Sequence, residues 1–360
     1  MIKLSYNPEK GNSFIKEFKD PLFLLVLSYT ETAENDGITV AGADKSLLKY
    51  TPPADAEFIE YGYCKSIDAI PATPDGKPTP ALLTRVALRI ADIPMLVIDG
   101  GSKIKPSMPY LDISSTYAKN IVKEDALKID DVKRIYENSI LLGRKLGKIS
   151  KYIVIGESIP AGTTTALALL MAMGIDARFK VSSSMPNNPH NLKLDIVEKA
   201  MKRSGIELGS LRDKPLDAVS HIGDAMMITV AGLSIGASNS KILLAGGTQM
   251  CAILALIKVL NHNTLDNIVI GTTKYIVDDK DSNIISLVKE IADVPIISID
   301  LGLERSQHDG LRAYTRGFVK EGAGAGGACI ASLLKSNYSN NKLLNNIDEE
   351  YLLTIKRQRS

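Results

Sequence analysis

Residues 241–248, with the sequence KILLAGGT, decide the fold, because a short apolar run is followed at once by glycines and a threonine. A strand that helices cover on both faces is apolar almost throughout. Such runs recur from about residue 80 onward, separated by helical patterns. They occupy residues 95–98, 152–155, 241–244, 267–270 and 295–299. This alternation predicts an α/β fold in which helices cover a largely parallel sheet.

Small and polar residues follow each of these runs. They occur at residues 99–101, 156–157, 245–248, 271–273 and 300–302. Open parallel sheets bind ligands in the crevice outside the carboxyl ends of their strands, so these junctions are expected to line one site. At any single junction, however, a glycine needed only for loop geometry is the more common explanation.

The length and composition fit a globular protein with a large core. The chain has 360 residues, of which 45% are hydrophobic and 23% are charged. We expect an α/β unit over residues 76–335 and a smaller, mostly helical lobe built from the less regular residues 1–75 and 336–360.

The charges and cysteines argue against several classes of function. The 43 basic and 41 acidic residues are spread along the chain, so no polyanion-binding stripe is visible and nucleic acid is not an expected partner. The three cysteines have no CxxC spacing, which argues against a zinc site or a disulfide framework and fits a reducing cytoplasm. The longest apolar runs, such as residues 23–27 and 166–173, are too short to cross a membrane.

A carboxylate stands before the turn in the glycine-rich stretch KEGAGAGGA at residues 320–328. Glycines allow the backbone to approach a ligand closely, and the N–H groups at a helix N-terminus attract anions. Glu321 is therefore a candidate general base. The competing interpretation, in which the glycines only permit tight helix–sheet packing and Glu321 is solvated, fits this motif alone equally well. The glycine spacing also matches the dinucleotide fingerprint, but no second strand with an acidic residue follows, and no cofactor is expected.

A second candidate site lies in the segment GESIPAGTTT at residues 156–165. It follows a predicted strand and precedes an apolar helix, but it lacks the lysine of an ATP-binding P-loop. The free N–H groups and hydroxyls of Gly162, Thr163 and Thr164 suit a phosphate. A plain threonine N-cap explains this segment alone equally well. Glu157 is expected to face the same crevice.

Together, these segments resemble the nicotinate-nucleotide:dimethylbenzimidazole phosphoribosyltransferase family, and in particular its archaeal and cyanobacterial branch. The resemblance rests on residues 156–166, the helix that carries Lys193, the strand end at Gly246 and Gly247, and residues 321–325. It implies a Rossmann-like parallel sheet, a small helical lobe from both chain ends, and a homodimer.

The resemblance also implies a reaction that needs no metal or cofactor. Nicotinate mononucleotide gives its ribose phosphate to a benzimidazole-type base. The products are nicotinate and the α-ribazole phosphate of the cobamide lower ligand.

The resemblance further implies roles for single residues. Glu321 would take the proton from the acceptor base, and Glu157 would be a second carboxylate of the active site. The residues implied for the phosphate and the rest of the substrate are Gly162, Thr163, Thr164, Lys193, Gly246, Gly247, Gly322 and Gly324. Less specific positions of the family pattern, near the acceptor, match Asp99, Gly100 and Asp224.

The acceptor side departs from the family pattern. The family's Pro-Pro-Gly-Ser-Leu-Gly segment is absent, and residues 51–55, TPPAD, match it only in part. A purine or a phenol therefore stays open as the acceptor. A non-catalytic nucleotide-binding relative that kept the phosphate site is the alternative from another class of function.

Overall fold

The computed structural model describes residues 1–39, 45–69 and 77–359, and the strands in these residues form one sheet. The eight strands follow the order β1-β8-β7-β6-β5-β2-β3-β4, with β1 antiparallel to β8 and the other pairs parallel. They are β1 (Ile2–Tyr6), β2 (Leu22–Leu27), β3 (Met95–Asp99), β4 (Leu111–Asp112), β5 (Tyr152–Ser158), β6 (Lys241–Ala245), β7 (Ile268–Thr273) and β8 (Ile296–Ile299). The predicted α/β fold is confirmed, and each predicted apolar run is a strand.

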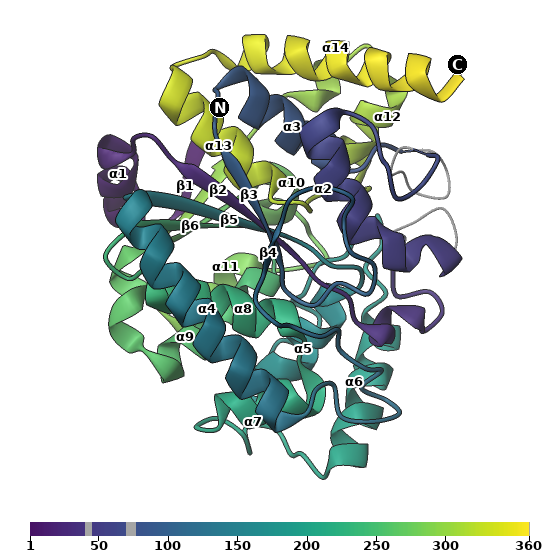
Figure 1. The fold of residues 1–360 in the computed structure, drawn as a ribbon, viewed down its shortest axis with the longest axis vertical. Coiled ribbons are helices and arrows are strands. Elements are labelled where there is room, and N and C mark those ends of the chain that lie inside the picture. The colour runs from purple at the N-terminus through teal and green to yellow at the C-terminus, as the bar shows by residue number, and fades with distance from the viewer. Residues whose placement is uncertain (40–44, 70–76, 360) are drawn as a thin grey trace.

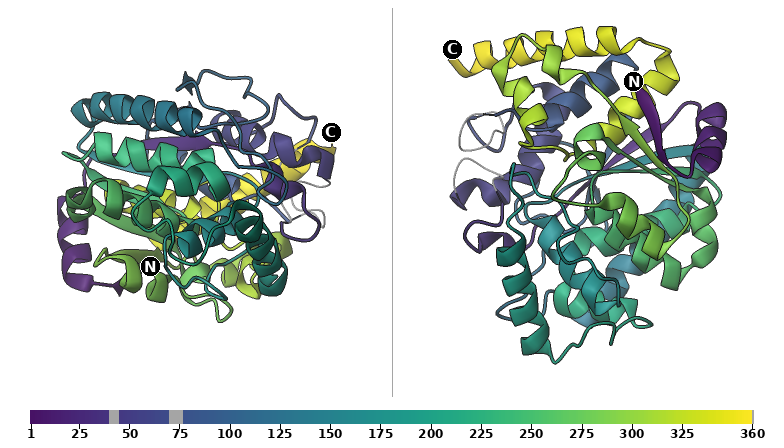
Figure 2. Two further views of the ribbon diagram at one scale, coloured as in Figure 1. Left: turned by 90° about the horizontal axis from the view of Figure 1, so that it is seen from below. Right: turned by 180° about the vertical axis from the view of Figure 1, so that it is seen from behind.

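Helices cover both faces of the sheet (Figures 1 and 2). Leu24 and Val26 of β2 lie in one core, while their neighbours Phe23, Leu25 and Leu27 lie in the other. The first core is covered by α4 (Ile129–Ile149), α5 (Gly162–Ala172), α6 (His190–Ser204), α7 (Pro215–Ile222), α8 (Ala225–Gly236), α9 (Gln249–Leu260) and α11 (Ile284–Ile291). The second is covered by α1 (Pro8–Glu17), α2 (Thr51–Tyr61), α3 (Ala81–Ile90), α13 (Ala325–Ser336) and α14 (Asn340–Arg359).

Shorter helices connect these elements. They are α10 (Lys274–Val277), α12 (Asp309–Arg312) and the 3₁₀ helices η1 (Glu31–Glu34), η2 (Lys45–Tyr50), η3 (His262–Asn267), η4 (Leu303–Arg305) and η5 (Ala313–Arg316). No helix in the described part of the chain is long and apolar enough to cross a membrane.

The sheet takes two strands from residues 1–75, which we expected to belong to a small helical lobe. β2 lies between β5 and β3, and all six of its residues are buried because both faces are covered. β1 closes the opposite edge against β8. The helical part of the prediction corresponds to α2 and α14, which both pack against α3. In Figure 1, α14 lies at one end of the molecule and α7 at the other. A separate lobe stays a prediction.

The N-terminal half of α13 lies directly on the sheet because small residues meet there. Gly156, Ala245 and Gly271 occupy neighbouring positions across β5, β6 and β7. A Cβ atom added at Gly156 would lie 2.9 Å from the Gly324 Cα, and one added at Gly327 would lie 2.3 Å from the Ala245 Cβ. This close approach brings the loop before α13, which carries Glu321, to the carboxyl ends of the strands.

Candidate active site

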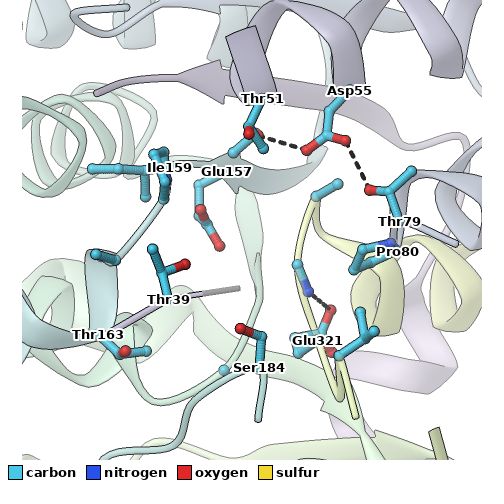
Figure 3. A pocket seen from close by; sticks show the side chains of 18 of the residues that line it. Thr39, Thr51, Asp55, Thr79, Pro80, Glu157, Ile159, Thr163, Ser184 and Glu321 are labelled. Carbon is cyan, nitrogen blue, oxygen red and sulfur yellow. Dashed lines mark hydrogen bonds between the residues drawn. The ribbon is translucent and has the colours of Figure 1, made fainter. Parts of the chain in front are cut away.

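A cavity of about 200 Å³ opens at the carboxyl ends of β5, β6 and β7. Three carboxyl groups line it, from Asp55 on α2, Glu157 at the end of β5 and Glu321 before α13. In Figure 3, Asp55 and Thr163 lie on opposite sides of the cavity, and Glu157 points between them. The structure therefore joins the two segments that the sequence had marked separately, residues 156–165 and residues 320–328.

Glu321 is held by four hydrogen bonds. One carboxylate oxygen, Oε2, accepts from the Thr273 N–H at 2.9 Å and the Thr272 hydroxyl at 3.3 Å. The other, Oε1, accepts from the N–H groups of Gly326 at 3.0 Å and Gly322 at 3.2 Å. Burial raises the pKa of Glu321 to about 7, although these donors favour the ionised form. The carboxyl group is thus fixed in direction and close to half-ionised at neutral pH.

The backbone around Glu321 is strained. Val319, Lys320 and Ala323 have positive φ angles of 65°, 55° and 49°. Such conformations are unfavourable for residues with a Cβ atom and persist only where surrounding contacts enforce them. At Gly322, φ is 150°, which a side chain rarely adopts. Other contacts must therefore hold this loop in its strained conformation.

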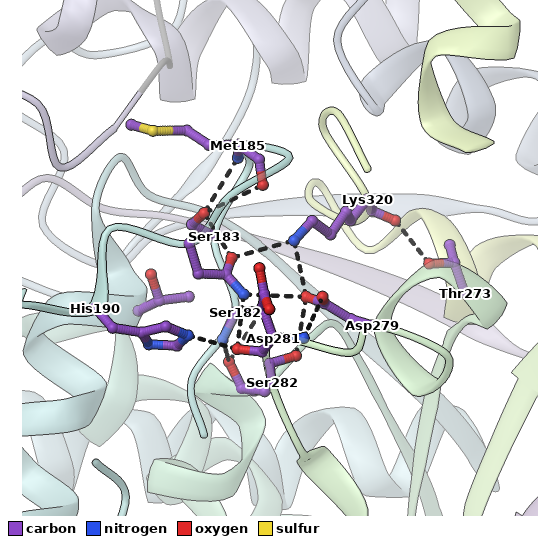
Figure 4. A network of polar contacts seen from close by, with 12 residues as sticks. Ser182, Ser183, Met185, His190, Thr273, Asp279, Asp281, Ser282 and Lys320 are labelled. Atoms are coloured by element: carbon purple, nitrogen blue, oxygen red, sulfur yellow. Dashed lines mark hydrogen bonds and ion pairs between the residues drawn. The ribbon is translucent and has the colours of Figure 1, made fainter. Parts of the chain in front are cut away.

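A buried ion pair between Lys320 and Asp279 holds the loop in place (Figure 4). The Lys320 ammonium lies 2.7 Å from Asp279 Oδ2, and the two side chains are only 2% and 8% exposed. It also donates to Asn188 Oδ1 at 3.1 Å. Burial alone would raise the pKa of Asp279, but Lys320 holds it below its usual range. The Thr273 hydroxyl donates to the Lys320 carbonyl at 2.6 Å, so both the side chain and the backbone of Lys320 are fixed.

Glu157, the second carboxyl group of the cavity, is surrounded by other acids. It is 3% exposed, and burial together with the nearby carboxyl groups of Glu321, Asp224 and Asp55 raises its pKa well above the usual value. These surroundings favour the protonated form of Glu157, and in that form the carboxyl group can donate a hydrogen bond into the cavity.

The side of the cavity around Thr163 suits an anion. Gly162 and Thr163 begin α5, and Ser182 and Gly247 also line the cavity there. Behind Thr163, the fully buried Lys193 ammonium donates to the Thr163 hydroxyl and to the Ser182 carbonyl, both at 2.7 Å. We call these five residues the anion cradle.

Lys193 is a buried cation with no described acidic partner. Burial, with a contribution from Lys320, lowers its pKa to about 7, and no carboxylate in the described residues counters this shift. A phosphate in the cradle would supply the missing negative charge, and the N–H groups that open α5 would add to the attraction.

Several residues predicted for the site do not reach the cavity. Thr164 is buried beneath the start of α5, where its hydroxyl has no partner among the described residues, and Gly246 and Gly324 serve packing. Asp224 caps α8 by accepting from the Met227 N–H at 3.0 Å, and it also accepts from the Thr165 hydroxyl.

Asp99 and Gly100 also lie away from the cavity. Asp99 accepts from the N–H and the hydroxyl of Ser102 and pairs with Lys105, so it organises the loop after β3. Asp99, Gly100 and Asp224 are thus absent from the described lining of the cavity and contribute to local structure, and their assignment to the acceptor pocket stays a prediction.

Other cavity residues were not identified from the sequence. They are Asp55, Thr79, Ser158, Gln249 and the serines Ser182, Ser183 and Ser184. The partial family match at residues 51–55 was the one signal for Asp55. No group of three or more His, Cys, Asp or Glu residues in the described chain is arranged to hold a metal ion.

Comparisons with known proteins identify the family and the fold of the chain. A phosphoribosyltransferase family model matches residues 83–276. A UPF0284 protein from Saccharolobus islandicus (strain M.14.25 / Kamchatka #1) is 46% identical over 351 residues, which cover 98% of this chain and 97% of that protein. A UPF0284 protein from Archaeoglobus fulgidus is 44% identical over 329 residues, covering 91% and 92%.

Two solved structures share the fold. A nicotinate-nucleotide-dimethylbenzimidazole phosphoribosyltransferase from Thermus thermophilus aligns with a TM-score of 0.60 at 13% identity, covering 90% of this chain and 83% of that one. CobT from the same organism aligns with a TM-score of 0.58 at 14% identity, covering 94% and 92%. At this identity the alignments establish the fold alone. The family match and the close UPF0284 relatives show that the chain belongs to the nicotinate-nucleotide:dimethylbenzimidazole phosphoribosyltransferase family.

Proposed function

We propose that the protein transfers the phosphoribosyl group of nicotinate mononucleotide to an aromatic base, in the assembly of a cobamide lower ligand. The observation that carries this proposal is that Glu321 lines the same cavity as four residues of the anion cradle, while the fifth, Lys193, lies directly behind Thr163. The family supports a phosphoribosyl donor. The family match ends at residue 276, so the role of Glu321 rests on its geometry.

In this proposal the 5′-phosphate lies in the anion cradle. The N–H groups of Gly162 and Thr163 and the Lys193 charge hold it at the start of α5. The ribose then extends toward Glu157 and Glu321. The raised pKa of Glu157 favours its protonated form, which would donate a hydrogen bond to a substrate oxygen there.

The reaction needs one base. A ring nitrogen of the acceptor attacks the anomeric carbon, the bond from that carbon to the nicotinate nitrogen breaks, and the acceptor's other ring nitrogen loses its proton to Glu321. Four donors already occupy the acceptor positions of Glu321, so the acceptor's N–H takes the place of the longest of them, the 3.3 Å hydrogen bond from the Thr272 hydroxyl. Nicotinate leaves from a nitrogen that is already cationic, so no acid has to protonate it. General-base catalysis of this kind contributes about 10²–10⁴-fold, and it is most effective when the pKa of the base lies near the working pH, as it does for Glu321.

Nicotinate release, measured by chromatography with a panel of benzimidazoles, adenine and phenols, tests the proposal. We expect release that depends on an acceptor and falls at least about 10²-fold in Glu321→Gln. Glu137→Gln, which changes an exposed acid on α4, is the matched control and should retain full activity. Nucleotide binding without release for any acceptor would favour the non-catalytic relative, and full activity of Glu321→Gln would remove Glu321 as the base.

The proposal includes a homodimer, which the family resemblance implies. The mass of the protein in solution, against 38.9 kDa for one chain, tests that part separately.

A further inference from the structure

The side of the cavity opposite the anion cradle contains a buried acid that the proposed reaction does not use. Asp55 is 5% exposed and lines the cavity together with Thr79 and Ser158 (Figure 3). Its surroundings are otherwise largely apolar. The apolar side chains that line this cavity include Ile38, Leu47, Ala54, Ile67, Pro80 and Ile159. Such walls suit the faces of a flat aromatic ring.

Asp55 has unused capacity to accept hydrogen bonds. The Thr79 hydroxyl donates to Oδ1 at 2.8 Å, and the Ser158 hydroxyl donates to Oδ2 at 2.7 Å. An ionised carboxylate has about four acceptor positions, so about two remain. Burial raises the pKa of Asp55 to about 6, which still leaves it mostly ionised at neutral pH.

No described residue that lines the cavity carries a positive charge. The lining contains the carboxyl groups of Asp55, Glu157 and Glu321 but no lysine, arginine or histidine. A buried acceptor position without a donor is unfavourable. A ligand that presents an N–H or O–H group to Asp55 should therefore bind more tightly than one that presents a methyl group.

We propose that Asp55 selects an acceptor base that carries an amino or hydroxyl donor on the edge away from its reacting nitrogen. This inference rests on the proposed function, because it names the class of acceptor. It predicts that 5,6-dimethylbenzimidazole is a poor acceptor. Sites built to hydrogen-bond a substrate group discriminate strongly against analogues that lack it, since the protein's own polar atom is then left unpaired.

Equilibrium binding of matched bases tests the inference without any turnover. The probes are 5-hydroxybenzimidazole and 5-methylbenzimidazole, which have similar size but differ in the donor, together with adenine and 5,6-dimethylbenzimidazole. We expect the wild type to bind the hydroxyl compound at least about tenfold more tightly than the methyl compound. Equal affinities would overturn the inference.

Two variants separate selection by Asp55 from a purely structural role. Asp55→Leu should abolish or reverse the preference for the hydroxyl compound. Thr79→Val removes a hydrogen bond to Asp55 but leaves the carboxylate, so it should keep the preference. If Thr79→Val loses the preference to the same extent as Asp55→Leu, the role of Asp55 is only to link α2 to residue 79, and the inference is wrong. Asp55→Asn, which keeps one acceptor oxygen, should show an intermediate preference for the hydroxyl compound. It replaces Asp55→Leu in the test if that variant does not fold.

Phosphoribosyl transfer to the same four bases then distinguishes this inference from the proposed function. A preference in binding that depends on Asp55, without transfer to any base, would support Asp55 as the selecting residue and contradict the transferase. Transfer with no donor preference in kcat/KM for any variant would support the transferase and contradict the role of Asp55.

Discussion

Glu157 and Glu321 are the same kind of residue in one cavity, yet their surroundings affect their pKa values differently. Glu321 receives four hydrogen bonds that favour its ionised form, three of them from backbone N–H groups. Burial and three neighbouring carboxyl groups raise the pKa of Glu157 well above its usual value. Environments that separate the pKa values of two acids in this way suit one of them to act as a base and the other as a donor.

The first prediction concerns pH. Glu321 must be ionised to accept a proton, and its pKa is about 7, so kcat/KM should rise as the pH increases toward about 7. Lys193, whose pKa is also about 7, loses its charge above that pH, so phosphate binding weakens and kcat/KM should fall again on the alkaline side. The measurement is a kcat/KM profile from pH 5 to pH 9. Glu157→Gln, which replaces an acid whose surroundings favour the protonated form by a neutral amide, should keep the position of this rise. A wild-type profile that is flat between pH 5.5 and pH 8.5 would contradict the assignment of Glu321.

The second prediction concerns the stability of Lys193→Met. The pKa of Lys193 is about 7 in the folded protein against an ordinary value of 10.5, so the unfolded chain binds more protons between these pH values. Burying the Lys193 charge therefore lowers the free energy of unfolding by its full amount below about pH 7, and this cost disappears as the pH rises toward 10.5. Each pKa unit corresponds to about 1.4 kcal/mol. Lys193→Met should raise Tm at pH 6.5, and the gain should shrink toward pH 10.

The same substitution should weaken binding of nicotinate mononucleotide, because the anion cradle loses its charge. Calorimetry measures the affinity, and Lys202→Met, an exposed position on the same helix, is the matched control for both readouts. A Lys193→Met variant that is less stable than the wild type at pH 6.5, or that binds the nucleotide equally well, would contradict this account.

At the scale of elements, the contact between α13 and the sheet determines where Glu321 lies. Gly327→Ala would place its new Cβ 2.3 Å from the Ala245 Cβ, so α13 must move outward. We expect a loss of about 1–3 kcal/mol in the free energy of unfolding and a disproportionate loss of kcat. The control is Ala331→Gly in the same helix, which weakens the helix without pushing it off the sheet. Equal kcat in the two variants, at equal stability, would show that the contact does not position Glu321.

The ion pair that anchors the strained loop gives a further prediction. Asp279→Asn leaves the Lys320 ammonium buried without an anion, which should lower the free energy of unfolding by about 3 kcal/mol or more and reduce kcat. Adding Lys320→Met should restore much of the stability, because the unpaired charge is removed. Denaturant unfolding of both variants provides the measurement. Asp278→Asn, at the exposed neighbouring position, should leave stability unchanged.

At the scale of the whole molecule, the sequence predicted the local features and missed those that depend on distant segments. The apolar strands were predicted correctly because their signal lies within a few consecutive residues. Of the five junctions after them that were expected to line one site, Glu157 and Gly247 line the cavity, whereas Asp99 and Gly100 do not. β2 was missed although its apolar run at residues 23–27 was noted, because it lies outside the regular alternation of strands and helices that begins near residue 80. β1 was missed because edge strands carry a weak pattern. Asp55 and the Lys320–Asp279 pair were missed because they depend on approaches that only the fold creates. Asp99 and Asp224 were assigned to the site because an acid that caps a loop or helix looks, in sequence, like an acid that binds a ligand.

The pairing of β1 with β8 has a consequence for protein synthesis. Ile2 lies opposite Ile299, so β1 leaves the ribosome well before the strand with which it pairs. Until β8 has been made, β1 lacks this partner, and the strained loop with Glu321 has not been synthesised either. A chain in the course of translation therefore exposes an open strand to chaperones and neighbouring chains, and the cavity is complete only after the loop before α13 has been made.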